Sequence, residues 1–138
     1  MENQVGKINK QYPDGKIIKI GFGKNYKSCH MDFVPYIKNK QSKVLLKLTF
    51  TPCVQFLFTS LDYQFAKREQ EFLDVIAWGV DSDSNYLNNF LQQIKNDPVG
   101  SPQEHPEFIK NLKHFYFQGF EANIDIIASR LEIEEVKS

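Results

Sequence analysis

The sequence predicts an α+β fold: a mostly antiparallel, curved β-sheet of about six strands packed with one main helix, at about residues 83–96. Three observations lead to this prediction. A β-rich stretch covers residues 44–59, the residues after 83 follow a helical period, and no repeat or linker divides the chain. The 138 residues, 41% hydrophobic and 25% charged, have the size and composition of a single domain, 1–138.

The first third is predicted to form a turn and two strands. Pro13–Gly15 is expected to turn the chain, because proline presets the first turn residue and glycine accepts a positive φ. Residues 16–22 form an apolar run expected to be a strand. Residues 27–38 alternate between apolar and polar, which indicates a half-buried strand, and the polar residues 39–42 connect it to the next one.

The middle of the chain carries the strongest strand pattern. Residues 44–50 and 54–59 are predicted as two β-rich stretches. A bulge or bend is expected between them, because Pro52 cannot donate to a sheet ladder. Residues 61–70 are compatible with a short helix or a loop. Residues 72–80 are predicted as a further apolar strand, whose tryptophan is expected to be buried.

The main helix is predicted from side chains that recur on one stripe, namely Tyr86, Leu87, Phe90, Leu91 and Ile94. Three residues can cap its N-terminus with a side-chain oxygen: Ser82, Asp83 or Ser84. The helix is expected to end before Pro98, because proline disfavours helix at the preceding residue. The Pro-containing residues after it are predicted to be the main loop.

The last quarter is predicted to be a hairpin of residues 112–118 and 123–136. The apolar side chains of the second strand change parity along its length. Ile126 and Ile133 would fall on opposite faces of a regular strand, so a bulge is expected near residues 127–130.

Charge is balanced overall but divided along the chain. The formal net charge is zero, which argues against a simple nucleic-acid or anionic-membrane binder. Residues 1–69 carry 12 basic and 5 acidic side chains, whereas residues 70–138 carry 5 basic and 12 acidic ones. The two halves either interleave their charges on the folded surface, which we favour, or leave an acidic face for a basic partner.

Catalytic, metal and cofactor motifs are not expected. Gly21-Phe22-Gly23 lacks the third glycine and the following helix of a dinucleotide loop. The three histidines have no partner at metal-ligand spacing, and residues 81–85 lack the Gly and Glu of a calcium loop. Cys29 and Cys53 are expected to be reduced thiols, because no apolar signal core precedes them and the polar start indicates a cytoplasmic protein.

Two parts of the sequence resemble a family of small bacterial immunity proteins. The first is the closing stretch Phe115-Tyr116-Phe117 followed by residues 124–133, and the second is the central pair 44–58. The similar proteins belong to polymorphic-toxin and contact-dependent growth inhibition systems. The resemblance implies a cytoplasmic bacterial protein that binds and blocks one cognate toxin, and it carries over no catalytic residue.

The first functional hypothesis is therefore a toxin-neutralising binding protein whose acidic residues meet a toxin, for instance a basic nuclease domain. The candidate partner-binding residues are Asp74, Asp81, Asp83, Glu104 and Glu107. The alternative is a small-ligand-binding protein or enzyme that uses a cleft on the concave face of the sheet. A homo-oligomeric structural protein is a third hypothesis, which an exposed aromatic patch would support.

Overall fold

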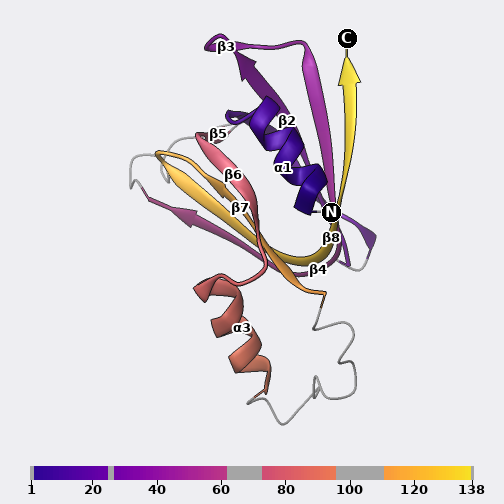
Figure 1. Ribbon diagram of the computed structural model, residues 1–138, viewed down its shortest axis with the longest axis vertical. Helices are drawn as coiled ribbons and strands as arrows, with labels where there is room; N and C mark the ends of the chain where they lie inside the picture. Colours follow the sequence, from indigo (N-terminus) through magenta and orange to yellow (C-terminus); the bar gives the residue numbers. More distant parts are fainter. Residues whose placement is uncertain (1, 25–26, 62–72, 96–110, 138) are drawn as a thin grey trace.

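The computed structural model describes residues 2–24, 27–61, 73–95 and 111–137. They form a curled antiparallel sheet with two helices (Figure 1). The strand order is β5-β1-β2-β4-β8-β7-β6, and the short β3 pairs with β2. The strands are β1 (Gly15–Phe22), β2 (Cys29–Ile37), β3 (Lys40–Gln41), β4 (Val44–Ser60), β5 (Leu73–Val75), β6 (Ala77–Asp81), β7 (Lys113–Gln118) and β8 (Ala122–Lys137).

The predicted α+β class with a curved antiparallel sheet is confirmed, but the prediction gave too few strands and too few helices. The described sheet has eight strands rather than about six, and a second helix joins the predicted one. Part of the difference is that residues 39–42, expected to be only a connection, include β3.

The two central strands, β4 and β8, form the longest ladder, which runs from Val44–Lys137 to Ser60–Ala122. The two predicted stretches 44–50 and 54–59 are one continuous strand that bends in the middle (Figure 1). The expected bend is present, since the Thr51-Pro52 peptide is cis and the register shifts between Cys53 and Gln55. The shift places the extra residue in β4 and not, as predicted, in β8.

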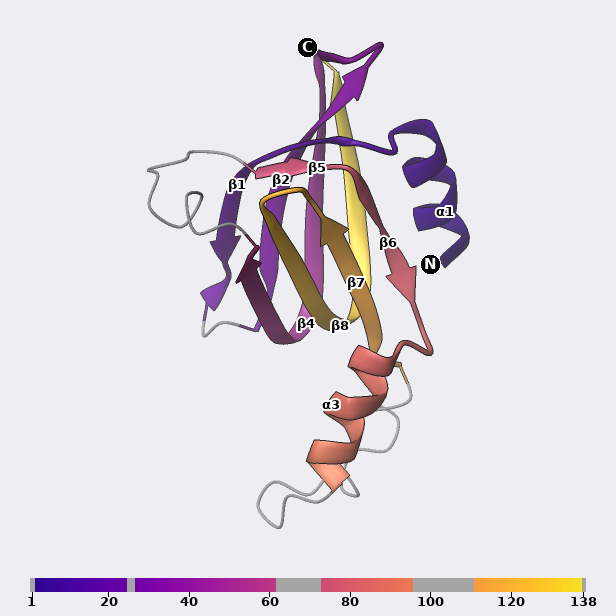
Figure 2. The ribbon, with the colours of Figure 1, turned by 90° about the vertical axis from the view of Figure 1, so that its left-hand side faces the viewer.

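Residues 72–80 were predicted as one strand, and their described part forms two. β5 pairs with β1 at one edge of the sheet, and β6 pairs with β7 at the other. Ile76 lies between them, and its N–H donates to the carbonyl of Gln118 at 2.7 Å. One continuous segment therefore links the two edges of the curled sheet (Figure 2).

The core lies inside the curl, where β2 and β4 face β6 and β7. Aromatic rings join the two layers: Phe33 lies 5.6 Å from Trp78, and Phe50 lies 5.2 Å from Phe115. The predicted burial of the tryptophan is confirmed at 3% exposure. The concave face is thus filled by side chains of the main core.

The first helix, α1 (Glu2–Gln11), was not predicted, because its sequence is mostly polar. It packs against the core through Val5 and Ile8, and Tyr12 follows it into the same cluster. Asn9 Nδ2 donates to the carbonyl of Trp78 at 3.0 Å, and Trp78 Nε1 donates to the carbonyl of Tyr12 at 2.8 Å. These contacts hold α1 beside the outer edge of β6 (Figure 2).

The second helix, α3 (Asn85–Lys95), confirms the predicted main helix within two residues at each end. Ser84, one of the three candidate caps, accepts the N–H of Leu87 at 3.0 Å. The helix packs on the face of β4 and β8 opposite the main core. There it forms a second apolar cluster, made of Leu87, Leu112 and Ile127 with Val54, Tyr86, Phe90 and Leu91 around them.

No helix in the described part of the chain is long and apolar enough to cross a membrane.

Candidate functional site

The outer face of β1, β2, β4 and β8 carries polar side chains because each strand alternates. On β2, Met31 and Phe33 face the core, which leaves His30 and Asp32 on the other side. Cys29 is buried and its neighbour His30 is only partly buried, in agreement with this alternation. The same period in β4 and β8 places further polar residues beside them, so one surface of the sheet is polar across four strands.

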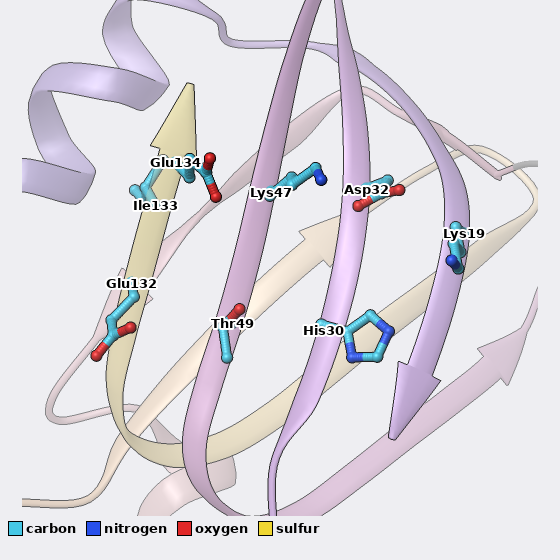
Figure 3. Close-up of a pocket in the computed structure, with 8 residues that line it drawn as sticks. All are labelled: Lys19, His30, Asp32, Lys47, Thr49, Glu132, Ile133 and Glu134. Atoms are coloured by element: carbon cyan, nitrogen blue, oxygen red, sulfur yellow. The ribbon is translucent and has the colours of Figure 1, made fainter. Parts of the chain in front are cut away.

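The strand register aligns four charged residues in one row across this face. Lys19 pairs with Asp32, Asp32 with Lys47, and Lys47 with Glu134. The signs alternate along the row, so each charge has an opposite charge on the next strand. Figure 3 shows the Lys47 side chain extending toward Asp32.

A second row lies two residues away from the first on each strand. It contains Gly21, His30, Thr49 and Glu132 in register. The His30 imidazole lies over Gly21, where a Cβ atom would come within 2.3 Å of His30 Nε2. Glycine at this position therefore makes room for the ring. Glu132 also lies 3.6 Å from Arg130 Nε on its own strand.

The two rows border an open hollow of about 430 Å³ on the outer face (Figure 3). Its lining residues are Lys19, His30, Asp32, Lys47, Thr49, Glu132, Ile133 and Glu134. Within the described residues, no direct hydrogen bond or ion pair joins the four charged side chains of the first row. They are thus close enough for mutual attraction and still available to a bound partner.

The two rows show how the charges of the basic and acidic halves of the chain combine on this face. Lys19 and Lys47 come from the basic half, whereas Glu132 and Glu134 come from the acidic half. The ladder between β4 and β8 brings the halves together, so their charges interleave on this face, as we favoured from the sequence. The face carries both signs and offers no single-sign patch.

A second polar cluster lies where α3 meets the sheet. Ser84 Oγ is 2.8 Å from His114 Nδ1, and His114 Nε2 is 2.7 Å from Asp125 Oδ1. Tyr86 stacks on the imidazole at 4.6 Å, and its hydroxyl donates to Gln55 Oε1. Burial, and then the charge of Asp125, raise the pKa of Tyr86.

The Ser84, His114 and Asp125 side chains have the composition of a hydrolase triad, but their contacts are structural. The Ser84 hydroxyl oxygen already accepts the amide that it caps, and His114 is only 8% exposed beneath Tyr86. A nucleophilic serine needs a free hydroxyl, and the Ser84 hydroxyl already contacts both the helix N–H and His114. The cluster fastens α3 to β7 and β8.

Of the acidic residues predicted from the sequence, the three that the structure describes do not lie together on one element. Asp74 lies on β5 and accepts the hydroxyl of Tyr36. Asp81 Oδ1 accepts the N–H of Asp83 at 2.8 Å, and Asp83 Oδ1 accepts Asn88 Nδ2 at 3.1 Å, so both shape the entrance to α3. β5 precedes β6 and α3 begins after it, so the length of β6 separates the two (Figure 2). The last two candidates, Glu104 and Glu107, lie outside the described residues.

Sequence reasoning missed the outer-face rows and the His114 cluster. The alternation of β2, β4 and β8 indicated which residues point outward, but the pairing of Lys47 with Glu134 depends on the register of strands far apart in the chain. His114 was treated as isolated for the same reason, because its partners Ser84 and Asp125 come from two other segments, the start of α3 and β8.

Exposed aromatic side chains bear on the third hypothesis, which an exposed aromatic patch would support. Phe120, in the turn between β7 and β8, is 78% exposed, and Phe22 and Phe58 are nearly half exposed. Oligomerisation stays a prediction.

Comparison with known proteins supports the fold alone. No family model and no curated protein matches the sequence. The structure is similar to the crystal structure of an uncharacterized protein from Neisseria gonorrhoeae, with a TM-score of 0.53 and 10% sequence identity. The similarity covers 89% of this chain and 92% of the other. The curled antiparallel sheet with its helices is therefore an arrangement that this chain has in common with a solved protein.

Proposed function

We propose that this protein is a non-enzymatic binding protein that neutralises a cognate bacterial toxin by direct contact in the cytoplasm. The observation that carries the proposal is the uncovered polar face of β1, β2, β4 and β8, with its row of alternating charges from Lys19 to Glu134. The resemblance of residues 115–117, 124–133 and 44–58 to immunity proteins supports the same function.

The form of the outer face favours a protein partner. The hollow is open, and the charged rows extend over four strands, so a large surface can lie against it. Complementary charges fix the orientation of two proteins and exclude partners with the wrong pattern. A row of alternating charges is complementary to a toxin surface that also carries charges of both signs. The toxin can carry a basic patch beside that surface.

The acidic candidates have a separate role in this proposal. Asp81 and Asp83 are exposed where the chain enters α3, and Glu104 and Glu107 follow in the sequence. Asp74 lies on β5, and none of the three described aspartates lines the hollow. Acidic residues outside the contact speed encounter with a basic nuclease, and this attraction fades as salt shortens the Debye length.

The experiment uses the toxic domain encoded beside the gene. Co-expression of the protein is expected to restore growth, and the purified proteins are expected to bind. The decisive variant exchanges two paired charges, Lys47→Glu with Glu134→Lys, which keeps the net charge and the cross-strand attraction. We expect at least a tenfold loss of affinity, about 1.4 kcal/mol, because the pattern facing the toxin is inverted.

Two further variants distinguish residues that contact the bound toxin from residues that only speed its association. Lys40→Glu changes an exposed charge on β3 and is expected to leave affinity unchanged. Asp81→Lys with Asp83→Lys is expected to slow association and flatten its salt dependence, with little change in dissociation. Absence of growth rescue and of binding would refute the proposed function. Binding that tolerates the charge exchange would instead place the contact on another surface.

A small charged ligand is the second candidate, because a volume of about 430 Å³ is within the range of small-molecule sites. This site would be on the outer face, whereas the sequence suggested a cleft on the concave face. A ligand that raises the melting temperature of the protein, but not that of the charge-exchange variant, would favour this function.

A further inference from the structure

Two cysteines that lie far apart in the sequence meet at the bend of the sheet. Cys29 begins β2, where it pairs with Phe50 of β4, and Cys53 lies in β4 just beyond the bend. The N–H of Cys53 donates to the carbonyl of Lys27 at 2.9 Å, which ties the two strands together at this point. Both side chains pack into the same apolar core, so the thiols lie on the same side of the sheet.

The two thiols belong to one core but differ in their surroundings. The Cys53 thiol donates a hydrogen bond to the carbonyl oxygen of Gln55 at 3.6 Å, and the Cys29 side chain packs in the same core. Cys29 is fully buried, whereas Cys53 is only partly buried. The neighbouring Cys29 lowers the pKa of Cys53, and the influence of Cys53, together with burial, raises the pKa of Cys29.

We propose that Cys29 and Cys53 form a reversible, oxidant-sensitive thiol pair, in which Cys53 reacts first with a peroxide and Cys29 then closes an intramolecular disulfide. A disulfide requires the two Cβ atoms about 4 Å apart with their side chains directed at each other. Cys29 and Cys53 lie on neighbouring strands that a backbone hydrogen bond ties together, and both side chains pack in one core, so a disulfide between them would join two adjacent strands. The pair is reduced at rest, and oxidation converts it.

The reaction needs one peroxide molecule and no other reagent. The Cys53 thiolate attacks one oxygen of hydrogen peroxide, the O–O bond breaks, and the products are Cys53 sulfenic acid and hydroxide. The sulfur of Cys29 then attacks the sulfur of Cys53. The S–O bond breaks, and the hydroxyl leaves with the Cys29 proton as water. In total, two thiols lose two electrons and two protons, and the peroxide becomes two water molecules.

The assignment of roles follows from access. A peroxide must reach the first sulfur, and partly buried Cys53 offers an approach that fully buried Cys29 does not. The second step is intramolecular and needs no solvent path, which suits a buried resolving thiol. The product would link β2 to β4 at the bend, between the charged outer face and the part of the sheet that carries α3.

The test uses the wild-type protein and intact-mass measurement. The reduced protein is treated with a stoichiometric amount of hydrogen peroxide, denatured and alkylated. We expect a monomer that has lost the mass of two hydrogen atoms and accepts no alkyl group, and dithiothreitol should restore two alkylation sites. Two alkylatable thiols after treatment, or a disulfide-linked dimer as the main product, would overturn the proposal.

Two variants test the order of the steps. In Cys29→Ser the sulfenic acid at Cys53 has no resolving thiol, so dimedone is expected to form an adduct there. In Cys53→Ser the remaining thiol is buried, and no adduct is expected in the folded protein. Each variant is first checked for wild-type circular dichroism. A dimedone adduct on Cys29 but not on Cys53 would contradict the assigned roles even if a disulfide forms.

Discussion

Trp78 is the residue at which three parts of the molecule meet. Its indole lies nearly parallel to the ring of Phe117 at 5.6 Å and contacts Phe33 across the core at the same distance. Its N–H donates to the carbonyl of Tyr12, where the chain leaves α1. A single buried side chain thus connects the two layers of the sheet and fixes the first helix.

We therefore expect Trp78→Ala to lower the free energy of unfolding by about 3–5 kcal/mol, because it leaves a large cavity and an unpaired carbonyl. Urea unfolding followed by circular dichroism measures the change. Trp78→Phe keeps a ring against Phe117 but loses the hydrogen bond, so its cost should be smaller. Equal unfolding midpoints for wild type and Trp78→Ala would show that the indole does not pack in the core.

At the scale of elements, α3 depends on its first turn for attachment to the sheet. Ser84 Oγ accepts the N–H of Leu87 and also contacts His114, which in turn contacts Asp125 on β8. The cap and the attachment are thus the same hydroxyl group. Leu87 then packs in the apolar cluster beneath the helix.

Replacing Ser84 by alanine is expected to cost about 1 kcal/mol, or up to about 2 because the contact with His114 is lost as well. Ser84→Asp keeps an acceptor for the helix N–H groups and should recover part of the stability. Ser82→Ala is the matched control, since Ser82 is exposed and precedes the cap. Chemical unfolding of the three variants gives the comparison, and equal losses at both serines would exclude Ser84 as the cap.

The short strand β5 is joined to β2 by one side-chain contact, in which the Tyr36 hydroxyl donates to Asp74. Burial, and then the hydrogen bond with Asp74, raise the pKa of Tyr36 from 10.0 to about 12. The folded protein therefore holds this proton more tightly than the unfolded chain does. The stability that the group contributes is fully present below pH 10.0 and is lost as the pH rises to about 12.

Ultraviolet titration of tyrosinate can check this shift. The difference between wild type and Tyr36→Phe isolates one phenol, which should titrate at about pH 12. In Asp74→Asn the same difference is expected at lower pH, although burial still holds it above the usual value. A Tyr36 titration that is identical with and without the Asp74 carboxylate would mean that the two side chains do not interact in solution.

At the scale of the whole molecule, the sequence predicted what depends on neighbours along the chain. The alternation of β2 and the stripe of α3 are local patterns, and both elements form where they were expected. α1 was missed because it is polar apart from side chains such as Val5 and Ile8. The burial of these two side chains depends on their contact with the core, which the local sequence does not show. The outer-face rows needed the register of β4 against β8, which no local pattern contains.

Gly119, which follows β7 and lies against the backbone of β5, gives a further prediction. A Cβ atom at Gly119 would lie 2.3 Å from the carbonyl oxygen of Asp74 and 2.9 Å from that of Ala122. These are backbone atoms that cannot move aside, so Gly119→Ala should lower the free energy of unfolding by about 1–3 kcal/mol. Gly6→Ala is the control, because nothing lies within 4 Å of its added Cβ, and in α1 it should stabilise the protein by up to about 1 kcal/mol. Thermal unfolding of both variants tests the contrast.

The position of β8 in the middle of the sheet has a consequence for how fast the protein folds. β4 must find a partner that follows it at a great distance along the chain, since Ser60 pairs with Ala122 and Val44 with Lys137. β7 can form a hairpin with β8 early, but β1 and β2 can join that hairpin only through β4. Such long-range pairing requires a large loop to close before its contacts repay the lost entropy, so folding should be slow, in milliseconds to seconds rather than microseconds.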